Sequence, residues 1–315
     1  MNLEDKILVT GSSGLVGTHL VSLLKDLGYI NIITPRSNQY DLRKAVDVNS
    51  LFTENKPDYV FSLAAKVGGI LDNKTFPADF YFDNILINAY IYDACKKFNV
   101  KKLISLGAGC GYPLGANEPL KESSIWDGFP QPESAPYSLA KKMMIIQSYA
   151  YRKQYNLNSC ILIPSNLYGE HDNFNLFSSH VIPALIRKFY ESKINNKPIE
   201  IWGDGSAKRD FIHAHDVCRA MVEAAKNYKK IDPLNIAFGK QYKIKDVVEL
   251  LREISDFSGN IQWNTDQPSG QSSREFSTAN LKKELSHFAP TIDLRAGLDR
   301  TYKWFASNYD NNIRL

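Results

Sequence analysis

The sequence is poor in cysteine, carries little net charge and has no long hydrophobic run. Its four cysteines among 315 residues show no Cys-x-x-Cys or zinc-binding spacing, which argues against a disulfide framework and fits a reducing cytosol. The net charge is only +4, with lysines scattered in pairs, so no basic stripe is available for nucleic acid. No apolar run approaches the roughly 18 residues of a membrane-spanning helix, and no leader-like segment precedes the first strand. We therefore expect a cytoplasmic protein without a metal site, nucleic-acid partner or membrane contact.

Close to the N-terminus, an apolar strand breaks into three glycines spaced three residues apart. Residues 7–9 are typical of a buried parallel strand, and an amphipathic helical pattern follows the loop. Gly11 permits the tight turn, Gly14 lets backbone amides approach a pyrophosphate, and Gly17 lets the helix pack close to the strand. The order of strand, loop and helix predicts a dinucleotide site rather than an ordinary glycine-rich turn. The residues expected to contact the cofactor there are Gly11, Ser12, Ser13, Gly14, Leu15, Val16 and Gly17.

The residues after the second predicted strand indicate which nicotinamide cofactor is used. An acidic side chain about 20 positions after the glycines would bind the ribose 2′-hydroxyl of NAD. The sequence instead has Arg36 in a Thr-Pro-Arg-Ser-Asn segment, and the first acidic residue after it is Asp41. A guanidinium suits a 2′-phosphate, so NADP (NADPH) is predicted, with a solvated loop arginine as the alternative. Asp41 is expected near the adenine.

Short β-rich runs alternate with helical patterns over the first half of the chain. This alternation predicts an α/β fold with a doubly wound parallel Rossmann sheet. Residues 1–170 are expected to form the NADP-binding domain, to which 213–238 return, and 171–315 a smaller, mostly C-terminal substrate lobe at the carboxyl ends of the strands. The polar residues 266–273 are expected to form a mobile loop. The expected strands are 7–9, 31–34, 59–64, 103–106, 160–163 and 199–202, and the expected helices are 44–54, 81–97, 137–155 and 181–192.

Tyr137 and Lys141 are the predicted proton-transfer pair, because a spacing of four places both side chains on one helical face. A phenol with a pKa of about 10 transfers protons poorly at neutral pH. A neighbouring ammonium and an oxidised nicotinamide ring both favour the phenolate and lower that pKa. The same spacing recurs, for example at Tyr149 and Lys153. Only Tyr137 follows the fourth strand after a loop long enough to cross the cofactor, so location selects it.

The glycine loop, the Leu63-Ala64-Ala65 segment and the Tyr137/Lys141 pair together resemble the extended short-chain dehydrogenase/reductase family. Further segments resemble its GDP-L-fucose synthase branch, whose members are NADPH-dependent 3,5-epimerase/4-reductases of GDP-4-keto-6-deoxymannose. The resemblance runs nearly from end to end, and the runs 171–174 (HDNF) and 180–183 (HVIP) are specific to this branch. The segments are 64–70 (AAKVGGI), 164–174 (PSNLYGEHDNF), 180–189 (HVIPALIRKF) and 209–213 (RDFIH).

The resemblance assigns roles to four catalytic residues. It implies that Tyr137 donates a proton to the C4 carbonyl oxygen and that Lys141 supports it electrostatically while holding the nicotinamide ribose. Cys110 and His180 are implied as the acid/base pair for inversion at C3 and C5, where the 4-keto group acidifies the neighbouring C–H bonds. The alternatives are a buried structural thiol for Cys110 and a helix cap for His180. Glycines on both sides of Cys110, just past a strand end, favour its exposure to a ligand.

The resemblance also extends the two binding sites. Arginine suits the diphosphate of a GDP-linked substrate, and tryptophan suits packing on its base. For two of the basic candidates, Lys188 and Arg274, a plain surface charge is the alternative. The implied substrate contacts are Ala108, Asn166, Val181, Arg187, Lys188, Trp202, Arg209 and Arg274, and the further implied cofactor contacts are Leu63, Ala64, Ala65, Lys141, Pro164, Asn166, Leu167 and His180.

The sequence departs from this branch at two places. Relatives normally carry a serine or threonine two residues before the catalytic cysteine, where its hydroxyl bonds the substrate carbonyl, but this chain has Ala108. Losing such a donor costs on the order of 10²-fold in rate, and Ser105 is expected to face the opposite side of its strand. The catalytic tyrosine with the thiol or a water could compensate, the sugar could sit differently, or reduction could be lost. The second departure is Glu275 and Thr278, where relatives often have a basic residue and an aspartate.

We therefore predict an NADPH-dependent enzyme that reduces the C4 ketone of a GDP-linked 4-keto sugar, a 6-deoxyhexose or a heptose, with or without 3,5-epimerisation, in polysaccharide or glycoconjugate synthesis. The alternatives are a C4 oxidoreductase or epimerase that retains its nucleotide between turnovers, and a non-catalytic nucleotide-sugar-binding protein. The resemblance alone implies a homodimer through the helices near 81–97 and 137–155. Neither helix is so apolar that its composition requires a partner.

Overall fold

The computed structural model describes residues 1–266, 271–311 and 313–315. Its centre is a six-stranded sheet in the order β2-β1-β3-β4-β5-β9, in which all neighbouring strands are parallel. The direction of winding reverses between β1 and β3, which is where open α/β sheets bind their ligands. The predicted doubly wound parallel sheet is thus confirmed. Its strands are β1 (Ile7–Thr10), β2 (Ile32–Ile33), β3 (Tyr59–Ser62), β4 (Lys102–Leu106), β5 (Ser159–Pro164) and β9 (Leu234–Ile236).

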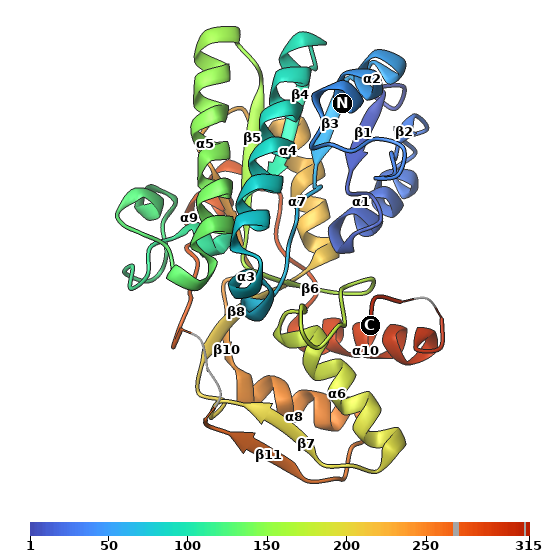
Figure 1. Cartoon of the computed structure of the whole chain (residues 1–315), viewed down its shortest axis with the longest axis vertical. Helices are drawn as coiled ribbons and strands as arrows, with labels where there is room; N and C mark the ends of the chain where they lie inside the picture. The colour runs from blue at the N-terminus through green and yellow to red at the C-terminus, as the bar shows by residue number, and fades with distance from the viewer. Residues whose placement is uncertain (267–270, 312) are drawn as a thin grey trace.

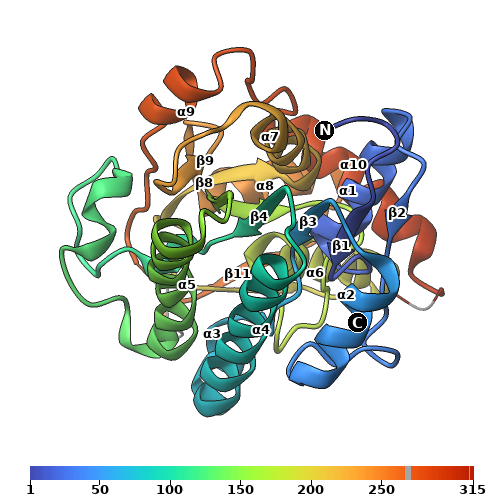
Figure 2. The same cartoon turned by 90° about the horizontal axis from the view of Figure 1, so that it is seen from above.

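Helices cover both faces of this sheet (Figure 2). Ile7 and Val9 pack into one layer, whereas Leu8 between them packs into the other. Because side chains alternate along a strand, a continuous apolar run is what a sheet buried on both faces requires. The first layer holds α1 (Leu15–Asp26) and α7 (Ala214–Asn227), and the second holds α2 (Ala45–Asn55), α4 (Pro77–Lys97) and α5 (Ala135–Tyr155).

A smaller lobe lies beyond the carboxyl ends of the strands, in the lower half of Figure 1. Two parallel strands, β7 (Ile199–Trp202) and β11 (Ile261–Asn264), pair there. Its core is separate from the two layers of the large sheet and includes Phe189, Leu251 and Phe305. The helices that enclose this core are α6 (Val181–Asn195), α8 (Ile244–Ser255) and α10 (Leu294–Asn308).

A three-stranded sheet in the order β10-β8-β6 joins the two lobes. Strand β6 (Asn166–Tyr168) follows β5 after a single residue, and β8 (Lys208–His213) runs directly into α7. Strand β10 (Gln241–Lys243) leads into α8. The chain therefore crosses between the lobes several times, so the lobes are linked by continuous secondary structure. The remaining short helical elements are α3 (Ile70–Thr75), η1 (Gly109–Gly111), η2 (Glu122–Trp126), η3 (Pro132–Ser134) and α9 (Ala279–Glu284).

The predicted elements are present, with shifted ends. Helices α4 and α5 begin earlier than predicted, at Pro77 and Ala135, because a proline is compatible with the first turn of a helix. Strands β8 and β10 were not predicted, because β10 is only three residues long and β8 pairs with segments about 30 to 45 residues away along the chain. Of the polar segment 266–273, residues 267–270 lie outside the described residues.

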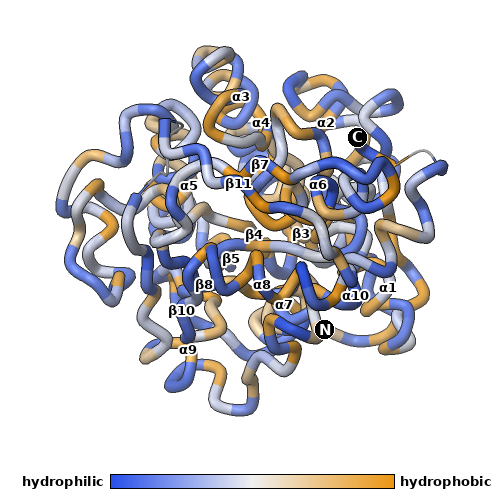
Figure 3. Tube along the Cα trace, turned by 90° about the horizontal axis from the view of Figure 1, so that it is seen from below, coloured by the Kyte–Doolittle hydropathy of each residue, from blue (hydrophilic) through white to orange (hydrophobic). Residues whose placement is uncertain are grey.

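The helices of this protein are amphipathic rather than uniformly apolar. Figure 3 shows hydrophilic and hydrophobic segments interspersed along the trace. Within the described ranges, no helix is long and apolar enough to cross a membrane.

Candidate active site

One large cavity, of about 1510 Å³, lies between the carboxyl ends of the sheet strands and the smaller lobe. It is lined by the loop after β1, by the segments after β3 and β4, and by parts of α5, α6, β7 and β8. Among the described residues, Ser12 and Arg187 are the predicted site residues outside this lining. The predicted residues that do line it are Gly11, Ser13, Gly14, Leu15, Val16, Gly17, Arg36, Asp41, Leu63, Ala64, Ala65, Ala108, Cys110, Tyr137, Lys141, Pro164, Asn166, Leu167, His180, Val181, Lys188, Trp202, Arg209 and Arg274.

The loop between β1 and α1 fits a pyrophosphate because Gly11 and Gly17 leave no room for a side chain at these positions. A Cβ on Gly17 would lie 2.1 Å from the carbonyl oxygen of Gly11, so the helix can pack this closely only with glycine there. Gly11 has a φ of +65°, which glycine adopts without strain. Helix α1 starts after Gly14, which has no side chain to cap it, so its first backbone N–H groups are suited to bind an anion. The close packing keeps Ser12 out of the cavity lining.

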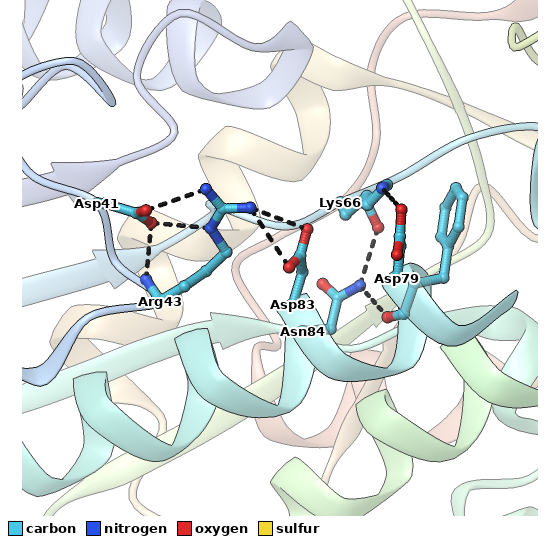
Figure 4. A network of polar contacts seen from close by, with 7 residues as sticks. Asp41, Arg43, Lys66, Asp79, Asp83 and Asn84 are labelled. Atoms are coloured by element: carbon cyan, nitrogen blue, oxygen red, sulfur yellow. Dashed lines mark hydrogen bonds and ion pairs between the residues drawn. The ribbon is translucent and has the colours of Figure 1, made fainter. Parts of the chain in front are cut away.

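Two arginines after β2 line the cavity, and Arg43 was not predicted. Arg36 is exposed, as a ligand for a 2′-phosphate needs to be. Arg43 bridges two carboxylates: its Nε lies 2.9 Å from Asp41 Oδ1, and its Nη1 lies 3.4 Å from Asp83 Oδ2 (Figure 4). The hydrogen bond from Arg43 lowers the pKa of Asp41 to about 2. The charge of Asp41, the residue expected near the adenine, is therefore already balanced within the protein.

Side chains of α4 hold the segment that follows β3 (Figure 4). The Lys66 Nζ lies 2.9 Å from Asp79 Oδ2. Asn84 is buried and donates from Nδ2 to two carbonyl oxygens, that of Lys66 at 3.0 Å and that of Phe80 at 2.7 Å. These contacts fix the backbone that carries Ala64 and Ala65 against the glycine loop, where the Ala64 amide nitrogen is 2.8 Å from a Cβ built on Gly11.

Helix α5 presents Tyr137 and Lys141 to the cavity from successive turns. The Lys141 Nζ donates a hydrogen bond to the Leu106 carbonyl oxygen, 3.1 Å away at the end of β4. Burial lowers the pKa of Lys141 to about 8, and burial together with the nearby Cys110 raises the pKa of Tyr137. The predicted lowering of the tyrosine pKa is therefore not a property of the protein alone, because desolvation raises this pKa and Lys141, bonded to the Leu106 carbonyl, does not offset it. The other predicted cause, an oxidised nicotinamide ring, arrives with the cofactor.

Cys110 lies in η1 and lines the cavity, whereas the other three cysteines are buried. Its exposure to the cavity favours the catalytic over the structural interpretation. Burial raises the pKa of the Cys110 thiol, and a hydrogen bond with the Ser138 side chain and the charge of Arg274 act in the opposite direction. Ala108 lines the same wall. Ser105 is completely buried within β4 and is not among the described residues of the lining, so it does not replace the missing hydroxyl.

His180 lies at the start of α6 and lines the cavity. It is the N-cap residue of α6, but within the described part of the chain its imidazole makes no capping hydrogen bond. The His180 side chain therefore does not cap α6, which was the alternative role considered for it. His180 keeps an exposed surface toward the cavity, and desolvation by the surrounding protein lowers its pKa, so the ring is neutral and able to accept a proton at neutral pH.

Arginine, lysine and tryptophan side chains line the part of the cavity formed by the smaller lobe. Burial lowers the pKa of both Arg209 and Arg274, and the charge of Arg274 also lowers that of Arg209. Two guanidinium groups held close together suit a ligand with two negative charges. Trp202 is 42% exposed, and the Lys188 Nζ lies 5.7 Å from the centre of its ring. Lys188 and Arg274 are thus cavity residues rather than plain surface charges.

Arg187 does not reach this wall. Its Nε lies 2.7 Å from Glu191 Oε1, and its Nη1 donates to the Phe174 carbonyl oxygen at 3.2 Å. The neighbouring Lys188 lines the cavity instead, since consecutive residues of a helix point about 100° apart. The structure therefore does not place Arg187 where a diphosphate ligand is needed.

Several polar residues of the cavity were missed by the sequence analysis. The Gln271 Nε2 donates to Gln131 Oε1 at 3.0 Å, so these two side chains connect the lobes across the cavity. Burial raises the pKa of Asp172 to about 7. Ser134 lines the cavity one helical turn before Tyr137. Asp172 lies in a branch-specific segment and could have been found there, but no spacing in the sequence distinguishes the other three.

Comparison with known proteins agrees with this architecture. A model of the NAD dependent epimerase/dehydratase family matches residues 7–238. The chain is 38% identical over 304 residues to a putative GDP-L-fucose synthase 2 of Arabidopsis thaliana, covering 96% of this chain and 92% of the plant protein. It resembles the solved GDP-L-fucose synthetase of Naegleria fowleri bound to NADP, with a TM-score of 0.93 and 30% identity over 100% and 96% of the two chains. It also resembles a GDP-6-OMe-4-keto-L-xylo-heptose reductase of C. jejuni, with a TM-score of 0.91 and 29% identity over 98% and 99%.

Proposed function

The chain belongs to the NAD dependent epimerase/dehydratase family, and we propose that it uses NADPH to reduce the C4 ketone of a GDP-linked 4-keto sugar. The observation that carries this proposal is a single cavity in which the glycine loop, the Tyr137/Lys141 pair and two half-buried arginines, Arg209 and Arg274, all take part. Relatives that match nearly the whole chain are GDP-L-fucose synthases, and similar structures include GDP-linked heptose C4 reductases. The enzyme is an NADP-dependent nucleotide-sugar ketoreductase.

The large sheet fits NADP. The glycine loop and the start of α1 would hold the pyrophosphate, and Arg36 would hold the 2′-phosphate. The bound cofactor supplies the hydride that goes to C4. We propose that residues 1–170 with 213–238 hold the cofactor and that 171–315 hold the substrate, since the cavity lies between these parts.

Tyr137 is proposed to supply the proton to the C4 oxygen as the carbonyl is reduced. Its raised pKa keeps the phenol protonated at neutral pH, as a proton donor must be. Lys141 is held at the Leu106 carbonyl, beside the strand end that leads to Cys110. From there its ammonium stabilises the phenolate that is left after proton transfer.

Cys110 and His180 are proposed to exchange protons at C3 and C5 next to the ketone. The thiol comes from the segment after β4 and the imidazole from the start of α6, on separate walls of the cavity. A neutral imidazole can take up a proton, and a thiol can give one up. Ala108 leaves the C4 oxygen without the usual hydroxyl donor, so Tyr137 carries this interaction in our proposal.

The diphosphate and base of the substrate are proposed to lie against the smaller lobe. Arg209 and Arg274 match the diphosphate, and Trp202 offers an exposed ring to the guanine. Lys188 stands beside that ring and is placed to contact a phosphate or the base edge. Asn166 donates from Nδ2 to the Asp210 carbonyl oxygen at 2.8 Å, which leaves its amide oxygen for the sugar.

The test is to follow NADPH absorbance after adding GDP-4-keto-6-deoxymannose or a GDP-4-keto-heptose, while deuterium incorporation from D2O at C3 and C5 is read by mass spectrometry. We expect NADPH oxidation with one of the two sugars. Deuterium exchange without NADPH oxidation would assign isomerisation alone. Absence of both with every 4-keto sugar tried would overturn the proposal in favour of a binding protein.

We also propose a homodimer formed through α4 and α5. These helices pack side by side in Figure 1. They expose large apolar side chains, including Tyr81 and Phe82 on α4 and Met143 and Ile146 on α5. Covering such side chains with a second copy removes them from water.

A further inference from the structure

We infer that Gly69 and Asn73, in the segment that follows β3, are positioning residues for His180. The inference rests on the proposed function, in which His180 exchanges protons with the sugar. The 64–70 segment stands out in the sequence, but the proposed reaction uses only its first two residues, as cofactor contacts. Its glycines hold the backbone from which His180 enters the cavity.

The turn at Gly68 and Gly69 lies directly against the backbone that precedes His180. The Gly69 N–H donates to the Ser178 carbonyl oxygen at 2.8 Å. A Cβ built on Gly69 would lie 2.8 Å from the Ser179 carbonyl oxygen, closer than a side-chain carbon normally approaches an oxygen. Gly69 has a φ of −68° and a ψ of −177°, a conformation that any residue can adopt. Glycine is therefore needed here for close approach and not for backbone freedom.

Asn73 fixes the orientation of this turn. Its Nδ2 donates to the carbonyl oxygens of Gly68 and Gly69, both at 2.9 Å. The Gly68 carbonyl and the Gly69 N–H belong to one planar peptide group, so holding the carbonyl also holds the direction of the N–H. Asn73 is only 5% exposed, and water therefore competes little for these bonds. The Gly69 N–H is thus kept pointing at Ser178.

His180 depends on its backbone for its position in the cavity. Helix α6 begins directly after it, and the Ala184 N–H donates to its carbonyl oxygen at 3.1 Å. Within the described residues its imidazole makes no capping bond that would hold the ring to α6. Ser178 lies two residues before it and is bonded to Gly69, and all three residues line the cavity. A shift of this backbone therefore moves the ring relative to the sugar.

The first test observes the imidazole directly, in the full-length protein without substrate. Histidine labelled with 13C at Cε1 gives one NMR signal for each of the six histidines, and the signal lost in His180→Asn is that of His180. Gly69→Ala should shift this signal, because the added methyl group must push the two backbones apart by about 0.5 Å. Asn73→Ala should shift it too, because the turn is released. The signals of His213 and His287, on other elements, should stay in place and report a retained fold.

Gly128→Ala and Asn55→Ala are the matched controls. A Cβ built on the exposed Gly128 comes no closer than 3.2 Å to its nearest neighbour, Pro113. Asn55 on α2 donates from Nδ2 to the Leu51 carbonyl oxygen at 2.8 Å, the same bond across one helical turn that Asn73 makes. Both controls should leave the His180 signal in place. A signal that stays in place in Gly69→Ala, or that moves as far in the controls, would overturn the inference.

A second measurement links the position of the ring to the reaction. In Gly69→Ala the kcat for deuterium incorporation at C3 and C5 of the 4-keto sugar should fall roughly 10- to 100-fold, while KM stays within about 3-fold, because a displaced base loses rate more than binding. Adding Gly69→Ala to His180→Asn should cost little more, since the group on which Gly69 acts is already gone. An equal further loss in that background would contradict the inference.

The two tests separate this inference from the proposed function. The NMR signal of His180 is read without any sugar, so it responds to Gly69 whatever the substrate is. Failure of the proposed function would show as no deuterium incorporation and no NADPH oxidation by the unmodified enzyme. Failure of the inference would show as an unmoved His180 signal in Gly69→Ala.

Discussion

At the scale of single residues, the site combines groups whose acidity is set mainly by burial. Tyr137, Cys110 and His180 are all held in their neutral forms by desolvation. Neutral groups of this kind can donate or accept a proton without first releasing a counter-ion. Lys141 is the exception, since its pKa of about 8 leaves it mostly charged at pH 7.

Tyr137→Phe should lower the rate of NADPH oxidation by roughly 10²-fold or more, because it removes the proposed proton donor while keeping the ring. Binding of NADPH, measured by fluorescence titration, should change little. Tyr149→Phe is the control on the same helix, since its hydroxyl lies 3.5 Å from Asp232 and outside the cavity lining described above. Equal losses in the two variants would remove Tyr137 from the mechanism.

Lys141 should make the stability of the cofactor-free protein depend on alkaline pH. Its pKa is lower in the folded state, about 8, than its ordinary value of 10.5. Below pH 8 the lysine is charged in both the folded and the unfolded protein, and burying the charged ammonium destabilises the fold. This free-energy cost disappears as the pH rises from 8 towards 10.5, because the folded protein then holds the neutral amine. The unfolding free energy of the unmodified protein should therefore gain on the order of 2 kcal/mol over this range relative to Lys141→Met.

Urea denaturation at pH 7.5 and pH 10 measures this difference. Lys153→Met, which replaces an exposed lysine on the same helix, should keep the pH dependence of the unmodified protein. A Lys141→Met variant with that same dependence would show that the folded-state pKa of Lys141 is not lowered.

At the scale of elements, a polar cluster fastens α1 to the strands that join the lobes. Glu170, just after β6, lies 2.9 Å from His213 Nε2 at the end of β8 and 3.5 Å from His19 Nε2 on α1. The Nη2 of Arg300 on α10 lies 3.0 Å from its other oxygen. One carboxylate just after β6 thus contacts α1, β8 and α10, near the start of the helix that follows the glycine loop.

His19 should make the protein acid-sensitive. Burial, followed by the charges of Glu170 and other histidines, sets its pKa at about 4, below the ordinary value of 6.5. Between these values the unfolded chain takes up a proton that the folded protein does not, so stability is lost as the pH falls from 6.5 towards 4. The unfolding free energy should drop by roughly 2 kcal/mol between pH 7 and pH 5 because of this residue.

The measurement is urea denaturation at these two pH values. In His19→Gln the unfolding free energy should fall by roughly 2 kcal/mol less between pH 7 and pH 5 than in the unmodified protein. This holds even if the variant is more or less stable at pH 7. The exposed His287 provides the control, and His287→Gln should lose as much stability on acidification as the unmodified protein. An unaltered drop in His19→Gln would contradict the proposed effect of its burial.

At the scale of the whole molecule, the site exists only because two lobes meet. The large sheet with its helices supplies the glycine loop and the Tyr137/Lys141 pair, the smaller lobe supplies Trp202, and the joining strand β8 supplies Arg209. The 271–277 segment is bonded to the loops after β4: the Leu120 N–H donates to the Glu275 carbonyl oxygen, the Ser277 N–H donates to the Leu120 carbonyl oxygen, and Arg274 donates to that of Gly109. Arg274, which is proposed to contact the substrate diphosphate, is thereby bonded to the backbone next to Cys110.

The proposed dimer gives a prediction at this scale. Ile146→Glu introduces a charge at the exposed apolar surface of α5 and should convert a dimer into a monomer, because burying an unpaired charge costs several kcal/mol. Multi-angle light scattering after size exclusion gives the mass directly. Ile194→Glu, on the exposed end of α6, should leave the mass unchanged. A monomeric unmodified protein would refute the proposal.

The sequence by itself determined the large sheet and the place of its ligand. Local patterns decide these features: an apolar strand, glycines at a turn and alternating periodicity are set by neighbours a few residues apart. For the same reason the Tyr137/Lys141 pair, Cys110 and His180 could be named before any coordinates, helped by a family resemblance.

Only the tertiary structure decided which side chains meet. It showed that Arg187 turns to Glu191 while Lys188 faces the cavity, and that Gln271 donates a hydrogen bond to Gln131 across the cavity. It also showed that burial raises the Tyr137 pKa instead of lowering it. Direction on a helix, contacts between distant segments and desolvation all depend on how the elements pack, and residue spacing along the chain does not specify that packing.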